Sequence, residues 1–404
     1  MVGPFGLRPK ATMRSRALPL GQALVRRGHT VHLLLPPWSA PEDAGRAWDE
    51  GGVRVEHVWL PPRLPGLYQA MLTARLYRRA LALGPDVIHY FKPKAYPAFV
   101  AQLARARRRL GGGRTALVLD SDDWEGPGGW NDVEPYGAWA RRLFAFQERW
   151  ELRRADAVTV ASRALETLAW AAGARRERVF YLPNGCLPPA AEGHGERVRA
   201  RHGLGRSPLL LLYTRFAEFT LAGLAEILRQ VAQARPDVRL LVVGQGLRGE
   251  EKRLPELLAP LGLAGAVSYA GWVEPGELGD YFAAAQVALH PYDDTLINRT
   301  KCSAKLGELL AHGVPVVASA VGENCHYVEH GLSGLLVPAG EPGVFAQAVL
   351  ALLADPDLAR RLGRAAAGRM RERFDWDRLA ERAEAAYRSA VRVERGDQGQ
   401  YRSN

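Results

Sequence analysis

Short apolar runs alternate along most of the chain with stretches in which apolar residues recur every three or four positions. The short runs have the length of buried strands, and the longer pattern is that of amphipathic helices. This alternation predicts parallel sheets covered by helices, which is an α/β architecture. In the first half we expect strands at Thr30–Leu35, Val53–Trp59, Asp86–Phe91, Ala116–Asp120, Ala157–Ala161 and Val179–Leu182. In the second half we expect them at Leu209–Thr214, Leu240–Val243, Ala266–Ala270, Val287–His290, Pro315–Ser319 and Gly334–Val337.

One segment breaks this rhythm and indicates a domain boundary. Residues 183–208 are rich in Pro, Gly and mixed charge, which is typical of a linker. We therefore expect an N-terminal Rossmann-like domain at 1–185, a linker at 186–207 and a second such domain at 208–375. A helix at 376–391 is expected to return to the first domain, and the polar tail at 392–404 is expected to be disordered.

The start of the chain leaves little room for a first strand. Only Met1 and Val2 precede the loop at Gly3–Thr12. Either this strand is very short, or the natural chain begins further upstream.

Two doubly wound domains joined by one linker predict a cleft. Ligands of open α/β sheets bind beyond the carboxyl ends of the strands. If the two sheets face each other, these ends line the same cleft. Such a cleft would bring a large donor and a separate acceptor together and exclude water.

The charge of the chain is unevenly distributed. The net charge is +11, with 28 Lys and Arg against 17 Asp and Glu before Cys186, and 26 of each kind from there on. The excess predicts either a solvated basic surface or a face for an anionic partner. We expect no nucleic acid, and we keep peripheral contact with an anionic membrane as an alternative, with Leu64–Leu83 as the candidate segment.

The cysteine content and the apolar segments indicate the cellular compartment. There are three cysteines, and their spacing matches neither a metal site nor a disulfide framework. No apolar run approaches the roughly 18 residues of a membrane-spanning helix, and the first residues lack the apolar core of a secretory signal. We therefore expect a cytoplasmic protein.

The most informative segment runs from Asn298 to Ala318, and its pattern predicts loop, helix, tight turn and strand. Cations cluster at the expected helix entrance, where the helix dipole disfavours them by roughly 0.3–1 kcal/mol each. A bound anion at that end would reverse the sign of this effect. Lys301, Lys305 and Glu308 have spacings that place them on one face of a helix. The lysines would then meet phosphate, and Glu308 would accept hydrogen bonds from a sugar hydroxyl.

Two further segments follow strands of the second half. Leu209–Tyr213 leads within two residues to Arg215, a residue suited to bidentate phosphate recognition or, alternatively, a solvated surface cation. Gly244–Gly249 matches G-x-G-x-x-G, but it follows the second strand of its domain and precedes a helix that contains Pro255. We therefore do not expect a dinucleotide cofactor there.

The first half holds two candidate loops. Asp120, Asp122 and Asp123 lie at the end of an apolar strand, where they could supply a base or bind a divalent metal, or simply cap a helix and pair with arginines. We commit to no metal. The loop with Gly3, Gly6 and Lys10 could cradle a phosphate, or it could be an ordinary strand–helix turn.

Taken together, these segments resemble the retaining glycosyltransferases of family 4, which have the GT-B fold. The likeness is densest from Ala155 to Trp376. It includes the end of the N-terminal domain, strands of the donor-binding domain and a motif near the C-terminal end of that domain. The matching segments are Arg154–Ser162, Val179–Gly185, Leu240–Gly246, Tyr269–Val273, Gly313–Ser319, Gly331–Pro338 and Phe374–Trp376.

The resemblance implies a role for each matching position. The first domain would be the acceptor side and the second would bind the nucleotide sugar. Arg215 would bind the diphosphate and Glu308, the second Glu of an E-x7-E pattern, would hold the ribose. The remaining donor-site residues implied or expected are Asn298, Lys301, Ser303, Ala304, Lys305, Gly246, Trp272 and Val273, with Gly3, Gly6 and Lys10 approaching the diphosphate from the first domain.

The chain departs from the family pattern at three places. The first Glu of E-x7-E is replaced by Thr300, and the Lys expected shortly after Arg215 is absent. We infer that Lys301 or Lys305 supplies that charge. The His expected near the sugar is missing, and Ser121–Asp123 stands there instead.

The resemblance implies retaining transfer of a sugar from a nucleotide diphosphate sugar to a glycan, lipid or small-molecule acceptor, with a role in cell-envelope polysaccharide synthesis. Arg215 and Lys305 would stabilise the departing diphosphate without a metal or other cofactor, and Asp122 or Asp123 would orient the acceptor or sugar. The alternatives are another GT-B enzyme, such as a nucleotide-sugar epimerase or a phosphorylase, and a non-catalytic module that binds nucleotide or lipid.

Overall fold

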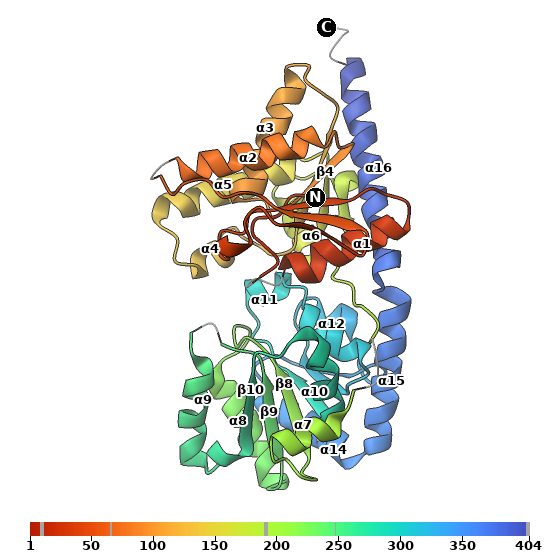
Figure 1. The fold of residues 1–404 in the computed structure, drawn as a ribbon. Helices are drawn as coiled ribbons and strands as arrows, with labels where there is room; N and C mark the ends of the chain where they lie inside the picture. Colours follow the sequence, from red (N-terminus) through yellow and green to blue (C-terminus); the bar gives the residue numbers. More distant parts are fainter. Residues whose placement is uncertain (9–11, 65–66, 190–192, 247, 401–404) are drawn as a thin grey trace. The chain divides into compact units, whose positions relative to one another are not determined.

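The computed structural model describes residues 1–8, 12–64, 67–189, 193–246 and 248–400, with the side chains of 394–400 outside that description. The chain divides into two compact units (Figure 1). Unit 1 comprises Met1–Asn184, Thr300–Cys302 and Trp376–Asn404, and unit 2 comprises Gly185–Arg299 and Ser303–Asp375.

Unit 1 is built on a mostly parallel sheet. Val2 forms parallel bridges to both Leu34 and Tyr90, so a single residue completes the sheet between β1 and β4. The strand order is therefore β2-β3-β1-Val2-β4-β5-β6-β7. The strands are β1 His32–Leu35, β2 Ala47–Glu50, β3 Val53–His57, β4 Val87–Phe91, β5 Ala116–Ser121, β6 Ala157–Val160 and β7 Val179–Tyr181.

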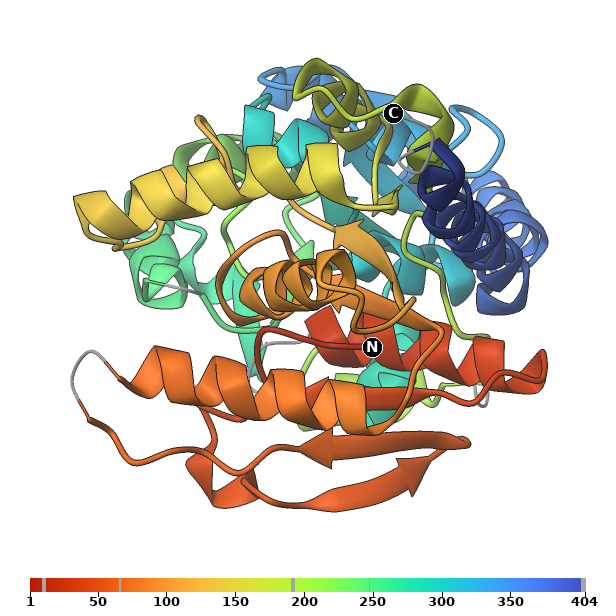
Figure 2. The same ribbon diagram turned by 90° about the horizontal axis from the view of Figure 1, so that it is seen from above.

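Helices cover both faces of this sheet. The helices α2, α3 and α5 lie side by side (Figure 2), and α16 packs against α1 and the strands β5 to β7. Small residues let α16 approach the sheet closely, because Ala386 and Ala390 contact Val118 and Ala157 in one buried cluster. The helices are a π-helical turn at Met13–Ala17, then α1 Leu18–Arg26, α2 Tyr68–Ala82, α3 Ala95–Arg109, α4 Trp130–Val133, α5 Ala138–Arg154, α6 Arg163–Ala171 and α16 Trp376–Gln400.

Unit 2 holds a six-stranded sheet in which every neighbouring pair is parallel, in the order β10-β9-β8-β11-β12-β13. Its strands are β8 Leu209–Tyr213, β9 Arg239–Val243, β10 Val267–Gly271, β11 Val287–His290, β12 Val316–Ser319 and β13 Leu335–Val337. Its helices are α7 Gly195–Arg201, α8 Leu221–Ala234, α9 Glu250–Leu258, α10 Leu278–Ala284, α11 Leu296–Thr300, α12 Ala304–Ala311, α13 Asn324–Tyr327, α14 Pro342–Ala354 and α15 Pro356–Arg373, with Thr300 at the end of α11 assigned to unit 1.

The sequence pattern predicts these strands well and misses one. The strand β2 runs antiparallel to β3 at the sheet edge, with an alternation of exposed and half-buried residues. Its residues, Ala-Trp-Asp-Glu, contain no apolar run, so the pattern of a buried strand is absent there. The helix α16 continues as far as Gln400, and the expected disorder of the tail at 392–404 stays a prediction. Residues 401–404 lie outside the described part of the chain.

Candidate functional site

The order of the strands locates a ligand site in each unit. In unit 2 the chain moves from β8 outward to β9 and β10, then returns to β11 on the other side of β8. Ligands of such sheets bind at this reversal, outside the carboxyl ends of the two central strands. The loops that follow β8 and β11 are therefore the candidate site of unit 2.

Arg215 lies in the loop after β8, on a turn held by buried neighbours. The amide of Phe216 donates a hydrogen bond to Thr214 Oγ1 at 2.8 Å, and the Phe216 side chain is buried although its φ is +61°. A Cβ atom on Gly244 would lie 2.0 Å from the carbonyl oxygen of Thr214, so only glycine fits beside this turn. The Arg215 side chain is exposed, and within the described residues it forms no ion pair.

Glu308 lies on α12 and is coupled to the end of β8. Burial raises the pKa of Glu308, while hydrogen bonding with Tyr213 and the charge of Lys305 oppose that rise. The Lys305 ammonium lies 5.5 Å from the centre of the Tyr213 ring. In the described part of the chain, Glu308 Oε2 is buried and has no hydrogen-bond partner. A buried carboxylate oxygen without a donor is destabilising, and a ligand hydroxyl would satisfy it.

The expected helix face of Lys301, Lys305 and Glu308 is wrong for Lys301. Ser303 caps α12, and its hydroxyl accepts a hydrogen bond from the Leu306 amide at 3.2 Å, so Lys301 lies before the helix. Lys301 belongs to unit 1, where its Nζ lies 5.7 Å from the centre of the Trp130 ring. Arg299 is paired with Asp294 at 2.7 Å. Lys305 and Glu308 alone share a face of α12, of which Ala304 is the first residue.

Asn298 connects the two loops of the unit 2 site. Its amide nitrogen donates to the carbonyl oxygens of Glu218 at 2.7 Å and Asp293 at 2.8 Å. These bonds tie the loop after β8 to the loop after β11. Asn298, expected to bind the donor, has both amide hydrogens committed to the backbone and therefore positions the loops.

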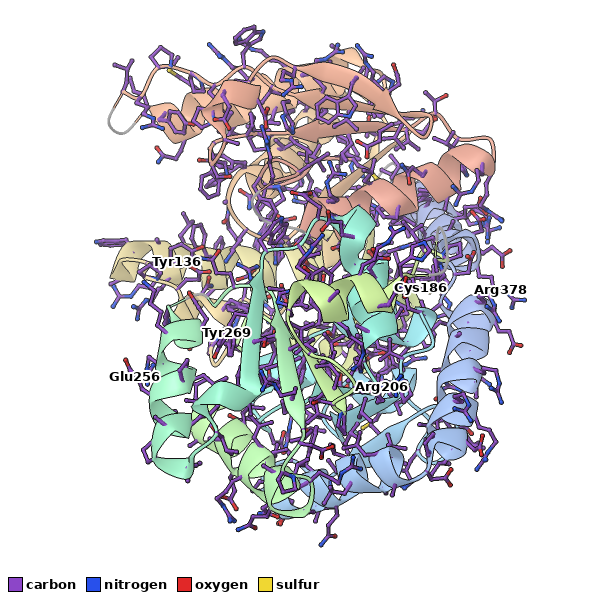
Figure 3. The ribbon with its side chains drawn as sticks, turned by 60° about the horizontal axis from the view of Figure 1, so that its bottom comes forward. Tyr136, Cys186, Arg206, Glu256, Tyr269 and Arg378 are labelled. Carbon is purple, nitrogen blue, oxygen red and sulfur yellow. The ribbon has the colours of Figure 1, made fainter. Side chains whose placement is uncertain are left out.

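Three more expected positions follow the strands β9 and β10. Trp272 follows β10 and is 65% exposed, whereas its neighbour Val273 is buried. The Gly246 amide donates to Glu251 Oε2 at 3.1 Å. The carboxylates of Glu250 and Glu251 at the start of α9 thus accept hydrogen bonds from amides of the loop that precedes this helix. Tyr269, labelled in Figure 3, lies on β10 and packs half-buried against the core of this sheet.

In unit 1 the strand order reverses between Val2 and β4. The Gly3 amide donates to the Leu34 carbonyl oxygen at 3.0 Å, so it is not available to a phosphate. A Cβ atom on Gly3 would lie 2.4 Å from Met13 Sδ, which means that glycine is needed there for packing. Gly6 is also buried, and Lys10 lies outside the described residues.

Asp120, at the end of β5, forms a buried ion pair. Arg16 donates to its two oxygens at 2.7 and 2.8 Å, and Thr159 Oγ1 donates at 2.7 Å. Burial by itself raises the pKa of Asp120, but Arg16 outweighs it and the pKa is lowered. Arg16 also donates to Asn184 and to the Leu182 carbonyl oxygen. Asp120 is therefore part of the core of unit 1.

Asp122 and Asp123 gather around a lysine that the sequence reasoning missed. Lys92 Nζ lies 3.1 Å from Asp122, 3.0 Å from Asp123 and 3.2 Å from Glu125. Burial raises the pKa of Asp122 to about 6, against the opposing effect of Lys92. Lys92 follows β4 directly with a φ of +70°, and its place after an apolar strand is the same signal that singled out Arg215.

This cluster continues into a second buried carboxyl group. Lys94 pairs with Glu125, and the Glu125 amide donates to Glu148 Oε1 at 3.1 Å. Burial raises the pKa of Glu148 to about 8. No group of three or more metal-ligating side chains is arranged around an open position among the described residues. Of the three carboxylates that the sequence had offered as metal ligands, Asp122 and Asp123 pair with Lys92, and Asp120 pairs with Arg16.

Comparisons with known proteins decide the family. Residues 12–185 match a family model described as "Glycosyl transferase 4-like domain", and residues 207–355 match "Glycosyl transferases group 1". The chain belongs to the family 4 glycosyltransferases. The two matched regions occupy unit 1 and unit 2 in the order that the sequence resemblance implies.

The curated relatives of this glycosyltransferase cover only part of it. D-inositol 3-phosphate glycosyltransferase from Acidothermus cellulolyticus is 32% identical over 59% of this chain and 55% of its own length. The enzyme of the same name from Streptomyces scabiei is 34% identical over 48% of this chain and 44% of its own. The chain therefore spans about half the length of the curated relatives it matches.

Solved structures show the GT-B fold over nearly the whole glycosyltransferase. Sucrose-phosphate synthase from Thermosynechococcus elongatus has a TM-score of 0.74 at 22% identity, covering 96% of this chain and 98% of its own. HepE from Anabaena, solved in complex with UDP and glucose, has a TM-score of 0.71 at 21% identity, covering 95% and 97%. None of the helices in the described residues is both long and apolar enough to cross a bilayer.

Proposed function

We propose that this protein transfers a hexosyl group from a nucleotide diphosphate sugar to an acceptor hydroxyl, with retention of the anomeric configuration. The observation that carries the proposal is the unit 2 site, where an unpaired Arg215 and an unsatisfied Glu308 oxygen stand at the carboxyl end of β8. A diphosphate satisfies the first and a ribose hydroxyl the second. The UDP complexes of the Anabaena neighbour support a donor of this class.

The hard part of this reaction is the departure of the nucleoside diphosphate. The bond from the anomeric carbon to the diphosphate oxygen breaks, and a bond to the acceptor oxygen forms as the acceptor loses its proton. Arg215 and Lys305 would stabilise the negative charge that develops on the diphosphate. Lys305 is our choice for the absent family lysine, because it shares its helix face with Glu308 whereas Lys301 precedes the helix.

The other positions keep narrower roles in the proposal. Trp272 and Val273 would line the nucleotide base after β10. Asp122 and Asp123 would orient the acceptor or the sugar from the Lys92 cluster of unit 1. We further propose that the acceptor is a glycan or a lipid-linked acceptor of the cell envelope, and that the protein works in the cytoplasm. Peripheral contact with an anionic membrane is the alternative role of the segment Leu64–Leu83.

One observation favours a second candidate, a module that binds a nucleotide sugar without turning it over. Thr300 stands where the family has the first Glu of its pattern, and it is buried. Its carbonyl oxygen accepts a hydrogen bond from Ser162 Oγ at 2.7 Å. Position 300 therefore offers no carboxylate to a donor.

Product analysis separates these candidates. The protein is incubated with a panel of nucleotide diphosphate sugars, with and without glycan and lipid-linked acceptors, and the products are identified by mass spectrometry. Transfer predicts a glycosylated acceptor together with free nucleoside diphosphate. An altered sugar nucleotide without an acceptor would indicate an epimerase, and binding without any product would leave only the non-catalytic module.

A further inference from the structure

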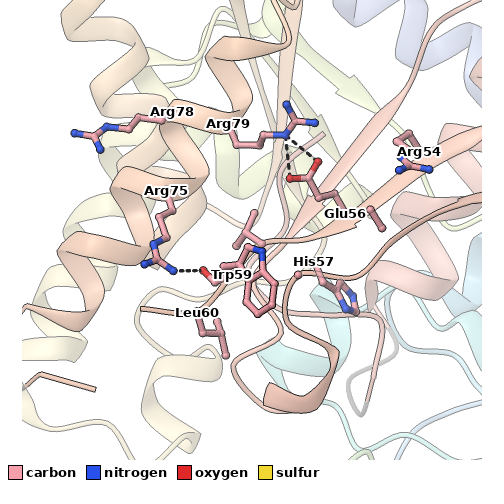
Figure 4. Close-up of a pocket in the computed structure, with 11 residues that line it drawn as sticks. Arg54, Glu56, His57, Trp59, Leu60, Arg75, Arg78 and Arg79 are labelled. Atoms are coloured by element: carbon pink, nitrogen blue, oxygen red, sulfur yellow. Dashed lines mark hydrogen bonds and ion pairs between the residues drawn. The ribbon is translucent and has the colours of Figure 1, made fainter. Parts of the chain in front are cut away.

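Unit 1 contains a large open pocket that the proposed reaction does not use. It has a volume of about 950 Å³ and lies between the β2–β3 edge of the sheet and α2 (Figure 4). The Lys92 cluster lies after β4 and β5, on the other side of β1 in the strand order. The pocket lining includes four arginines, one glutamate and an exposed tryptophan, so it combines positive charge with an aromatic surface.

The tryptophan is exposed, yet its indole lies directly against the backbone at Gly45. Trp59 is 69% exposed, and a Cβ atom on Gly45 would lie 2.3 Å from its ring atom Cε2. Gly45 has a φ of +81°, so the absence of a side chain there lets the indole lie against the backbone. Arg75 donates to the Trp59 carbonyl oxygen at 2.9 Å and fixes the main chain. The indole is therefore a preformed surface for stacking.

The arginines of the pocket divide into two pairs by their partners. Arg79 is neutralised by Glu56 at 2.8 Å, and Arg54 by Asp49 at 2.8 Å. Arg75 bonds to a backbone carbonyl, which leaves its charge uncompensated, and Arg78 has no ion pair within the described residues.

Arg75 and Arg78 are three residues apart on α2, so they project from adjacent positions of one helix face. Both come from the stretch that the sequence had offered as a membrane contact. Two uncompensated guanidinium groups beside a preformed aromatic surface favour a ligand that combines an anionic group with a flat, weakly polar face.

We propose that this pocket binds an anionic carbohydrate, with a sugar ring stacked on Trp59 and its carboxylate or phosphate held by Arg75 and Arg78. A pyranose has a face of C–H groups that matches an indole, and an acidic substituent matches the guanidinium groups. A small inorganic anion would contact the arginines but would not stack on the Trp59 indole. A bilayer surface would require a protruding apolar face, whereas Trp59 lines a hollow.

The direct test is calorimetric titration of the full chain with tetragalacturonate and with its methyl ester. The two oligosaccharides have the same rings and differ in charge. We expect the acid to bind at least about tenfold more tightly than the ester, and its affinity to fall as salt is added. Equal affinity for the two would overturn the proposal.

Variants assign the binding to this pocket. Trp59→Ala should weaken tetragalacturonate binding by about tenfold, Trp59→Phe should retain most of it, and Arg78→Ala should weaken it by a similar factor. Trp139→Ala is the matched control, because Trp139 is 82% exposed on α5 and does not line the pocket. Unfolding temperatures are compared to show that each variant is folded.

Other ligands define the contrary outcomes. If inorganic phosphate or AMP binds as tightly as tetragalacturonate, or if Trp59→Ala and Trp139→Ala behave alike, the pocket is not a site for anionic carbohydrate. Trp59-dependent binding to phosphatidylglycerol vesicles, without binding of the oligosaccharide, would also reject it and assign the surface to membrane contact. The titrations need no glycosyl transfer, so their result is independent of the proposed reaction.

Discussion

Glu308 shows how a single buried group ties the fold to the proposed chemistry. Burial raises the pKa of its carboxyl group, and one buried oxygen has no hydrogen-bond partner among the described residues, which destabilises the protein without a ligand. The sequence pattern predicts this residue as a candidate because of its spacing from the cations that precede it, and its role at the donor stays a prediction. The sequence could not reveal that Tyr213, nearly a hundred residues earlier, forms a hydrogen bond with this carboxylate.

Replacing Glu308 by Gln removes the charge and keeps an oxygen that accepts from Tyr213. We expect the free energy of unfolding of the unliganded protein to stay the same or to rise, because a buried charge is lost. We expect affinity for a nucleotide diphosphate sugar to fall by about tenfold. Thermal unfolding and calorimetric titration measure the two effects. Unchanged donor affinity would show that Glu308 does not touch the donor.

Glu148 gives a prediction about pH. Its ordinary pKa of 4.5 is raised by burial to about 8, so between these values the folded protein binds more protons than the unfolded chain. The unfolding free energy should therefore decrease as the pH rises through this interval. Glu148→Gln, which keeps the oxygen that accepts from the Glu125 amide, should flatten that decrease.

Urea unfolding at several pH values between 5 and about 8 tests this expectation. Glu256→Gln is the control, since Glu256 is exposed on α9 and its replacement should leave the slope unchanged. A pH dependence in Glu148→Gln equal to that of the parent protein would contradict the assignment of a neutral carboxyl group at this position.

At the scale of elements, the pattern of apolar residues predicts what the chain buries. Strands with continuous apolar runs, such as β8 and β11, are found close to their expected bounds because burial on both faces requires such runs. The edge strand β2 lacks this signal and is missed. Lys301 is misplaced because the spacing of charges resembles a helix face, whereas the Ser303 cap starts α12 two residues later.

The contact between the loops after β8 and β9 can be tested at Gly244. Gly244→Ala should destabilise the protein by about 2 kcal/mol or more, because the new methyl group meets a backbone carbonyl 2.0 Å away and the φ is +114°. The same change at Gly262, where φ is +72° and no atom lies within 4 Å, should cost only about 1 kcal/mol. Denaturant unfolding of both variants gives the comparison, and equal losses would contradict the close approach.

At the scale of the whole molecule, the sequence predicts two Rossmann-like units and places the donor site in the second. The strand order agrees with two such units, because both reverse direction at their centre. The donor site in the second unit stays a prediction. The expected cleft between the domains stays a prediction. The sequence could not show which cations are paired within the protein. Arg16, Arg299 and Lys92 are distinguished from Arg215 only by their partners in space.

The central claim is that Arg215 and its neighbours bind the diphosphate of the donor. The most direct measurement is calorimetric titration of nucleoside diphosphates into the parent protein, Arg215→Ala and Arg206→Ala. Arg206 is an exposed arginine that precedes β8, at the opposite end of that strand (Figure 3). We predict that Arg215→Ala weakens binding by at least about tenfold, while Arg206→Ala binds like the parent. Equal affinity in all three proteins would contradict the account.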